Sequence, residues 1–481
     1  MRADPSYLVI SPFLFSVAIL VFKKHSKLLS TLEAMLNLLL VSILFLEGDY
    51  DFYISNWVSK GIHLLVDFNT KVILLMISIV FLSVTLNSLK KDYNHHFYFF
   101  SSVFLASTNA SMMAYDLFNI YVVIELASLT AYLLIGYKQK TIQLWASLKY
   151  LILSSVALNF YLLGIGIIYA YNRTFDISKI EVLPEISIVF VLVGLLAKSG
   201  IFFMSMWLPL AHSEAETEVS ALLSGIFVKI GAFQIIKLLS IEAFSTARPL
   251  ISMIAIVSSI LGTVYAFSEK STKKVLAYST LSQMGFVLSG TSLANILHMF
   301  NHGIFKSLLF LTVGDSVENM EKKNFQDLKD KKIPLLRNLT LKIALFGIMG
   351  VPLFSGFVSK SLVDHEMHFT GKIGLSIAAV GTVASLWRFL SLRTQRIAKE
   401  KIRENIGYLI LTTFVILVGA IGTFKMNLSD ILKSLILIAL GVLVYKIFKL
   451  GNISKVFEKL DNALFIYIIF CVLGLIFFTV I

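Results

Sequence analysis

Several titratable side chains in this sequence lie inside long apolar runs, where solvent is not expected. Lys198 is one of them, because apolar residues flank it on both sides in LVGLLAKSGIFF. A charge at the centre of a bilayer costs about 3 kcal/mol on insertion scales, so it must face the protein interior or water. The candidates are one glutamate, five lysines and two histidines: Glu125, Lys149, Lys198, Lys229, His298, His302, Lys306 and Lys360.

These residue types are suited to moving protons. Burial favours the neutral form of a lysine and a nearby carboxylate favours the charged form, so movement of Glu125 relative to Lys198 would load or release a proton. Histidine titrates near neutral pH. Because His298, His302 and Lys306 are spaced at i, i+4 and i+8, they share one helix face and predict a hydrated path. Two alternatives remain: Lys149 snorkels to the headgroups, or the histidines are satisfied core side chains.

The composition predicts that membrane helices carry these residues. Of the 481 residues, 57% are hydrophobic and 15% are charged, whereas a soluble chain has about a quarter charged residues. Hydropathy gives about sixteen apolar segments, most of them long enough to cross a hydrocarbon core of about 30 Å. We therefore expect an all-α polytopic membrane protein, without a cleaved signal peptide.

The loops between the apolar segments alternate in charge. Lysine pairs follow the third and fifth segments, as at Lys90 and Lys138, and the intervening loops are acidic or mixed. The positive-inside rule then places the basic loops in the cytoplasm and both termini outside the cell membrane. The net charge of +13 is explained by these loops, so we expect no nucleic-acid partner. The acidic stretch HSEAETE (212–218) breaks the pattern.

Two apolar segments are interrupted by proline. Pro209 lies in MWLPLAH and Pro352 in GIMGVPLFSGF, five segments apart, and each interruption has a lysine nearby. Interrupted helices beside buried charges are typical of ion sites in transporters built from repeated halves. A five-helix unit would be inverted in its second copy. The predicted division is 1–96 for three N-terminal helices, 97–240 and 241–392 for the two repeats, and 393–481 for the C-terminal helices.

Redox chemistry is not expected within this chain. Cys471 is the single cysteine, which excludes a disulfide framework and cysteine-based metal sites. No G-x-G-x-x-G or Walker motif is present. We expect no cofactor or metal here, so any redox centre would belong to a partner.

Seven stretches carry a family resemblance. They are IELASLTAYLLIG, LLAKSG, MWLPLAH, VSALLSGIFVKIGAF, KKVLAYSTLSQMGF, LHMFNHGIFKSLLFLTVG and GVPLFSGFVSK. Between about residues 115 and 362, the chain resembles the antiporter-like subunits of complex I, Mrp-type cation/proton antiporters and membrane-bound hydrogenases. The resemblance implies 14–16 transmembrane helices, two inverted five-helix repeats and discontinuous helices 7 and 12.

The resemblance also implies roles for individual residues. Glu125 matches the essential glutamate of the fifth helix and Lys198 its seventh-helix partner. Lys229 matches the central lysine, and Lys360 matches the twelfth-helix residue near the exit. The eleventh-helix relay is matched by His298, His302 and Lys306.

One departure concerns the connection between the seventh and eighth helices. The family's two prolines before VSALL are replaced here by Glu216 and Glu218. Together with Glu214, these residues would either concentrate cations at the mouth of a path, meet a basic surface on a neighbouring subunit, or face water.

The resulting interpretation is a proton-translocating subunit of a multisubunit prokaryotic respiratory complex, with exchange of Na⁺ for protons also open. Its partners would be other membrane subunits, and a hydrophilic arm with iron–sulfur clusters in a redox-driven assembly. One alternative is a subunit of an Mrp-type Na⁺/H⁺ antiporter without redox coupling. The other is a structural paralogue that no longer conducts.

Overall fold

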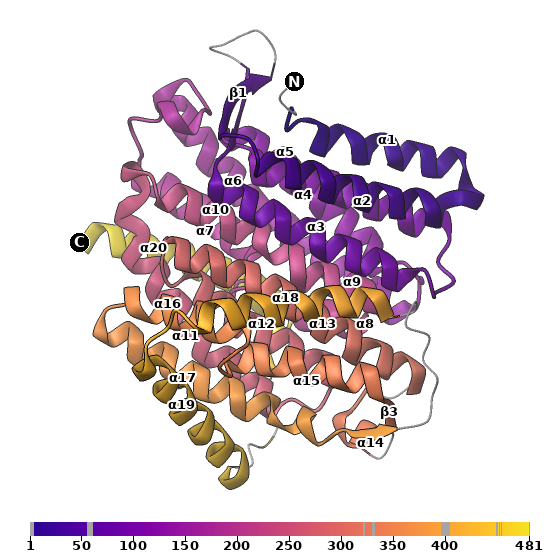
Figure 1. Ribbon diagram of the computed structural model, residues 1–481. Coiled ribbons are helices and arrows are strands. Elements are labelled where there is room, and N and C mark those ends of the chain that lie inside the picture. Colours follow the sequence, from indigo (N-terminus) through magenta and orange to yellow (C-terminus); the bar gives the residue numbers. More distant parts are fainter. Residues whose placement is uncertain are drawn as a thin grey trace.

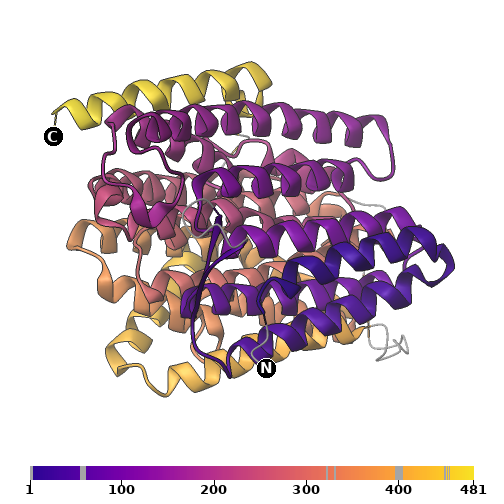
Figure 2. The same cartoon turned by 90° about the horizontal axis from the view of Figure 1, so that it is seen from above.

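The computed structural model describes residues 4–54, 61–320, 323–329, 332–395, 405–448, 451, 453 and 455–480. Its helices run roughly side by side along a common direction (Figures 1 and 2). The lysine-rich loops at 22–25, 89–94, 136–140 and 269–271 all follow helices that run the same way, and we call this end of the bundle the lysine-rich end.

The first half of the chain contains the N-terminal helices and the first expected repeat. The helices are α1 (Tyr7–Val21), α2 (Ser26–Leu44), α3 (Phe68–Ser88), α4 (His95–Met113), α5 (Leu117–Ile135), α6 (Thr141–Asn172), α7 (Glu185–Lys198), α8 (Leu208–Glu214), α9 (Thr217–Leu222) and α10 (Val228–Leu239). A π-helical turn, Leu223–Phe227, joins α9 to α10.

The second half continues the helical bundle. Its helices are α11 (Arg248–Ser268), α12 (Thr272–Leu288), α13 (Leu293–Met320), α14 (Phe325–Lys329), α15 (Leu335–Met349), α16 (Ser355–Glu366), α17 (Phe369–Leu386), α18 (Ile406–Thr423), α19 (Leu428–Ile447) and α20 (Leu460–Val480). Apart from the five-residue α14, the helices match the predicted spans one for one when each interrupted helix is counted once.

Within the described residues, eleven helices are long and apolar enough to cross a membrane. Most of the remaining passes are built from shorter helices: α7, α12, α15 and α16 have 14, 17, 15 and 12 residues. The expected all-α polytopic membrane fold is confirmed. The most apolar part of α13 is 94% buried and that of α19 only 6%, so α13 lies in the core and α19 at the periphery.

Two short pairs of strands close loops at opposite ends of the bundle. β1 (Tyr50–Ile54) pairs antiparallel with β2 (Ile62–Val66). His63 of β2 bridges Asp51 and Asp176, with ring nitrogen to carboxylate oxygen distances of 2.6 and 2.8 Å. Burial alone would raise the pKa of Asp176, but hydrogen bonds from Tyr53 and His63, among others, lower it below its ordinary value. β3 (Lys332–Pro334) runs parallel to β4 (Arg393–Gln395).

Both predicted interruptions are present, and their backbones are alike. In the first, between α7 and α8, φ is +67° at Gly200 and +69° at Phe203; in the second, between α15 and α16, φ is +81° at Gly350 and +75° at Leu353. The spacing of three residues is the same in both. Positive φ costs a side-chain-bearing residue about 1–3 kcal/mol, and such strain clusters at functional sites. The matching geometry supports the proposed repeat.

Pro209 plays a different part from the one expected. It does not interrupt the helix, because the break lies upstream and Pro209 falls in the first turn of α8. A first-turn N–H has no partner within the helix, so proline fits there without loss. Pro352 does lie within its break, between Met349 and Ser355.

Candidate functional site

Lys198, at the end of α7, is fully buried. Its Nζ donates to Ser128 Oγ of α5 at 2.7 Å and also to Ser154 Oγ of α6. No salt bridge joins it to Glu125. That carboxylate lies one turn before Ser128, is half-buried, and has Oε2 buried without a protein partner. Lys198 is thus bound by serine hydroxyls, one of which lies one turn from the Glu125 carboxylate on α5.

Lys149 of α6 is 4% exposed and does not snorkel to the surface. Its Nζ donates to the backbone carbonyl of Glu458, in the connection between α19 and α20. The Glu458 carboxylate accepts from Tyr278 Oη of α12, and Lys455 pairs with Glu269, in the loop between α11 and α12. The residues 455–459, the final connector, thus cover Lys149 at the lysine-rich end.

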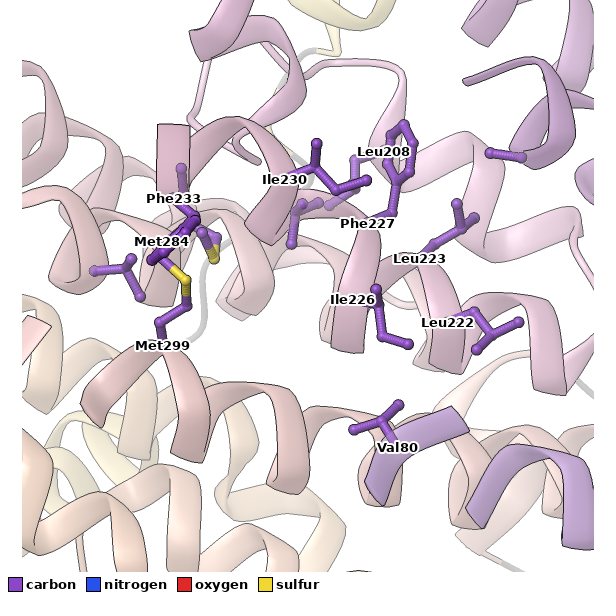
Figure 3. Close-up of a cluster of buried hydrophobic side chains, with 14 of the residues drawn as sticks. Val80, Leu208, Leu222, Leu223, Ile226, Phe227, Ile230, Phe233, Met284 and Met299 are labelled. Atoms are coloured by element: carbon purple, nitrogen blue, oxygen red, sulfur yellow. The ribbon is translucent and has the colours of Figure 1, made fainter. Parts of the chain in front are cut away.

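Lys229 lies on α10 directly after the π-helical turn and is fully buried. Its Nζ donates to the carbonyl of Ser224, within that turn. A π-helical turn interrupts the regular hydrogen-bond ladder and is frequent at functional sites. Figure 3 shows a cluster of buried hydrophobic side chains to which this turn contributes Leu223, Ile226 and Phe227, with Val80, Leu222, Ile230, Phe233, Met284 and Met299 among the others. The ammonium group is thus held in an apolar core by a carbonyl.

Two glycines bring the helices of the site together. A Cβ at Gly231 of α10 would lie 2.4 Å from the carbonyl oxygen of Leu195 and 2.8 Å from Lys198 Cβ. A Cβ at Gly225 of the π turn would lie 1.9 Å from Ser307 Oγ of α13. The backbone contact at Gly231 requires glycine, and a side chain at Gly225 would force Ser307 to move. These close approaches bring α10 and the π turn against α7 and α13, the helices of Lys198 and Lys306.

The histidines and lysine of α13 form the predicted stripe, and all three are fully buried. His298 Nδ1 lies 2.9 Å from Ser359 Oγ of α16, and both ring nitrogens of His302 lack a protein partner. Lys306 Nζ donates to the Leu276 carbonyl of α12 at 2.7 Å and to Ser279 Oγ. The alternative of satisfied core histidines does not fit, because His298 Nε2 and both ring nitrogens of His302 have no protein partner. Leaving a buried polar group unpaired costs about 1–3 kcal/mol.

Lys360 completes the row on α16. Its Nζ donates to the carbonyl of Ile348 at 2.6 Å, where α15 ends, and lies 5.1 Å from the ring centroid of Phe286. A pocket lined by Lys360, Asp364 and Lys433, among others, opens beside it at the end opposite the lysine-rich loops. This position fits a residue near an exit.

His212 is a buried titratable residue that the sequence analysis missed. It ends MWLPLAH on α8, is fully buried, and stacks on Phe310 of α13 with ring centroids 4.3 Å apart. Neither ring nitrogen has a protein partner. A polar residue at the end of an interrupted apolar helix was the available signal. Lys237, also missed, binds the carbonyls of Met112 and Ala114 that end α4.

The glutamates of SEAETE are neither exposed nor free for a neighbouring subunit. Glu216 is 6% exposed and pairs with Lys138, at 2.6 Å between Oε2 and Nζ. Glu218 is fully buried and accepts from Asn87 Nδ2 at 2.8 Å and Tyr93 Oη at 2.6 Å. Glu214 pairs with Lys323 at 2.8 Å. The expectation of a solvated or docking loop was wrong, because lysine, tyrosine and asparagine side chains from distant parts of the same chain meet these carboxylates.

Asp315 and Glu318 of α13 extend this group. Asp315 pairs with Lys90 at 2.6 Å and Lys91 at 3.0 Å, and Glu318 also pairs with Lys91. Burial alone would lower the pKa of Lys91, but Asp315, Glu218 and Glu318 raise it above its ordinary value. We call Glu214, Glu216, Glu218, Asp315, Glu318 and their lysine partners the ion-pair network.

A polytopic helical bundle with two interrupted helices and a row of buried titratable side chains defines an antiporter-like membrane subunit. Comparison with known proteins agrees. Residues 114–385, more than half of the chain, match the family described as NADH:quinone oxidoreductase/Mrp antiporter, TM. The chain belongs to this family.

Individual proteins are similar to this chain in sequence or in fold. The mnhD2 antiporter-subunit homologue of Staphylococcus aureus (strain JH9) is 28% identical over an alignment of 343 residues; the match covers 65% of this chain and 68% of that protein. A chain of the membrane-bound sulfane sulfur reductase, an archaeal respiratory membrane complex, has the same fold with a TM-score of 0.80 and 22% identity, covering 91% and 99% of the two chains. A chain of the Mrp complex from Dietzia sp. DQ12-45-1b has a TM-score of 0.80 at 20% identity, covering 92% and 56%.

Proposed function

We propose that this antiporter-like subunit moves protons across a prokaryotic cell membrane through the row of buried side chains on α5, α6, α7, α10, α13 and α16. The observation that carries the proposal is electrostatic. Among the described residues, none of the eight side chains, from Glu125 to Lys360, takes part in a salt bridge. Idle buried charges without counter-charges are costly, whereas groups that gain and lose protons need this freedom.

The order of the groups suggests a direction. Lys149 lies at the lysine-rich end and Lys360 beside a pocket at the opposite end. Between them, Lys198, Lys229, His302 and Lys306 occupy neighbouring helices. Consecutive members of the α13 stripe are about 6 Å apart along the helix axis, which bridging water can span. Protons would enter at the lysine-rich end, which we expect to face the cytoplasm, with both termini outside.

The test is the Glu125→Gln variant of the assembled complex, purified through a tag on this chain and reconstituted in vesicles. We expect most proton transport to be lost while assembly is retained, because glutamine keeps the shape but cannot ionise. Full proton transport by this variant would contradict the proposal. The transport would then not depend on Glu125 of this chain, which would favour the structural paralogue that no longer conducts.

The driving force separates the two conducting alternatives. A redox-driven complex would co-purify with a hydrophilic iron–sulfur arm, because we expect no redox cofactor in this chain. An Mrp-type assembly would co-purify with small membrane subunits and exchange Na⁺ for protons. The relatives include both kinds of assembly, so identifying the subunits that co-purify decides between them.

A further inference from the structure

A second buried carboxylate lies outside the proposed path. Glu33 of α2 is 1% exposed. Its Oε2 accepts from Ser102 Oγ of α4 at 2.5 Å, and its Oε1 is buried without a protein partner. None of the salt bridges among the described residues includes it. Glu33 therefore has one hydroxyl donor and no counter-charge.

The surroundings of Glu33 are polar along one stripe. Ser30, Glu33 and Asn37 lie at i, i+3 and i+7, on one face of α2. Asn37 Nδ2 donates to Ser78 Oγ of α3 at 2.7 Å, and Asn37 Oδ1 accepts from Asn109 Nδ2 of α4 at 2.8 Å. Two further oxygens, Ser30 Oγ and Asn109 Oδ1, are buried without a protein partner. Three helices thus direct oxygen atoms to one buried region.

This region is separate from the proposed proton path, the eight buried side chains from Glu125 to Lys360, which we call the relay. α2 packs on α1, α3 and α4, and it is α3 that packs on α13. In Figures 1 and 2 the indigo N-terminal helices form one edge of the bundle. A proton moving between the helices of Lys198 and Lys360 does not pass through α2.

A buried carboxylate without a counter-charge must be neutralised, because an isolated charge in an apolar medium is far more costly than an unpaired neutral group. Carboxylate and hydroxyl oxygens are hard ligands that suit small hard cations. The described residues hold no group of three or more His, Cys, Asp or Glu side chains that would suit a multivalent metal ion.

We propose that Glu33 is the centre of a monovalent-cation site between α2 and α4, at which Na⁺ and a proton compete. Ser30 Oγ and Ser102 Oγ are the further oxygen ligands of the metal ion. The site does not depend on conduction by the relay, since binding at α2 is an equilibrium property of the folded chain.

The test compares binding of radioactive Na⁺ to the purified complex with Glu33→Gln and Glu125→Gln. We expect the Glu33 variant to bind one Na⁺ fewer per complex, with an apparent affinity in the parent that weakens as the pH falls. Glu125→Gln should lose transport yet keep this Na⁺, so failure of the relay and failure of the site are distinguishable. Glu242→Gln, in a loop of another segment, is the control for general charge effects.

A second variant guards against misfolding. Ser30→Ala removes a hydroxyl whose oxygen has no hydrogen-bond partner in the protein. The complex should therefore still assemble, while its Na⁺ binding weakens several-fold. Infrared difference spectra between about pH 6 and about pH 10 identify the proton-bound form. A carboxyl band that titrates in the parent and is absent in Glu33→Gln supports the site. Equal Na⁺ binding in parent and variant, with a carboxyl band unchanged across this range, overturns it.

Discussion

The relay and the ion-pair network both contain lysines and glutamates, but these charges are arranged in opposite ways. In the network, each carboxylate meets a lysine, a tyrosine or an amide, as Asp315 does with Lys90 and Lys91. In the relay, lysines bind carbonyl or serine oxygens, as Lys229 binds the Ser224 carbonyl. A charge with a fixed counter-charge holds helices together, whereas a charge held only by neutral dipoles can be given up. The difference separates residues that stabilise the fold from residues that we expect to conduct.

The largest effect on transport is expected at the centre of the relay. Lys229→Met should lower proton transport by about a hundredfold, the lower end of what removing a proton-transfer group costs. Thermal stability of the purified complex should not fall, because replacing a buried charge by an apolar group of similar volume is often neutral or stabilising. Transport in vesicles and a thermal unfolding scan measure the two quantities.

Lys237→Met is the matched control for that variant. Lys237 is also a lysine of α10, but it is only partly buried, and it donates to the carbonyls of Met112 and Ala114 at the end of α4. Its loss should lower stability and leave transport per folded molecule largely intact. The reverse pattern, with Lys237 essential and Lys229 dispensable, would refute the comparison.

Breaking the network should have the largest effect on stability. Asp315→Asn leaves Lys90 beside a neutral group, whereas Lys91 keeps Glu318. The change should cost about 3 kcal/mol, the lower end of the range for removing one partner of a buried pair. The measurements are the yield of assembled complex and its unfolding midpoint. Transport per assembled complex should stay close to that of the parent, and an unaltered midpoint would show that the pairs contribute little.

Within the relay, Lys306 should matter more than His298. Lys306→Ala removes a charge and two hydrogen bonds to α12, whereas His298→Ala removes one contact, to Ser359. We expect transport by Lys306→Ala to be slower by about tenfold, a difference of about 1.4 kcal/mol in barrier height. Ser279→Ala removes one of the lysine's hydrogen bonds but not its charge, so its rate should lie between those of Lys306→Ala and the parent. Equal rates for the lysine and histidine variants would argue against charge as the deciding property.

The smallest effect is expected from salt. Surface glutamates that attract cations would act mainly at low ionic strength, since the Debye length shrinks from about 30 Å at 0.01 M to about 10 Å at 0.1 M. Glu214, Glu216 and Glu218 are paired inside the chain, so replacing all three by glutamine should leave the salt dependence of transport unchanged. A loss of rate confined to low salt would restore the funnel that the burial argues against.

The sequence was informative about the relay because charge inside an apolar run is a local signal. Lys198, Lys229 and Lys306 were identified in this way, and all three are fully buried. The same signal is present at Glu33, in the apolar stretch LLSTLEAMLNLLL. Proline indicated each interruption, although Pro209 lies beyond its break because proline is also favoured in a first helical turn.

The network could not be predicted, because it depends on residues that meet only in the folded chain. Glu218 and Asn87 are 131 positions apart, and Lys90 and Asp315 are 225 apart. No periodicity within one segment records such pairings, so the most local reading of SEAETE, an exposed acidic loop, was also wrong. The serines that bind Lys198 were missed for the same reason, since they belong to two other helices.

The final connector has a consequence for the order in which the protein is made. Lys149 emerges from the ribosome 309 residues before Glu458, whose carbonyl it binds. Throughout that interval α6 carries an ammonium group without its eventual acceptor, and the lysine-rich end of the first repeat is unfinished. A chain that stops before residue 455 would place every proposed relay residue in the membrane and still lack this cover. The connection between α19 and α20 therefore completes the lysine-rich end of the first repeat only after every proposed relay residue has been synthesised.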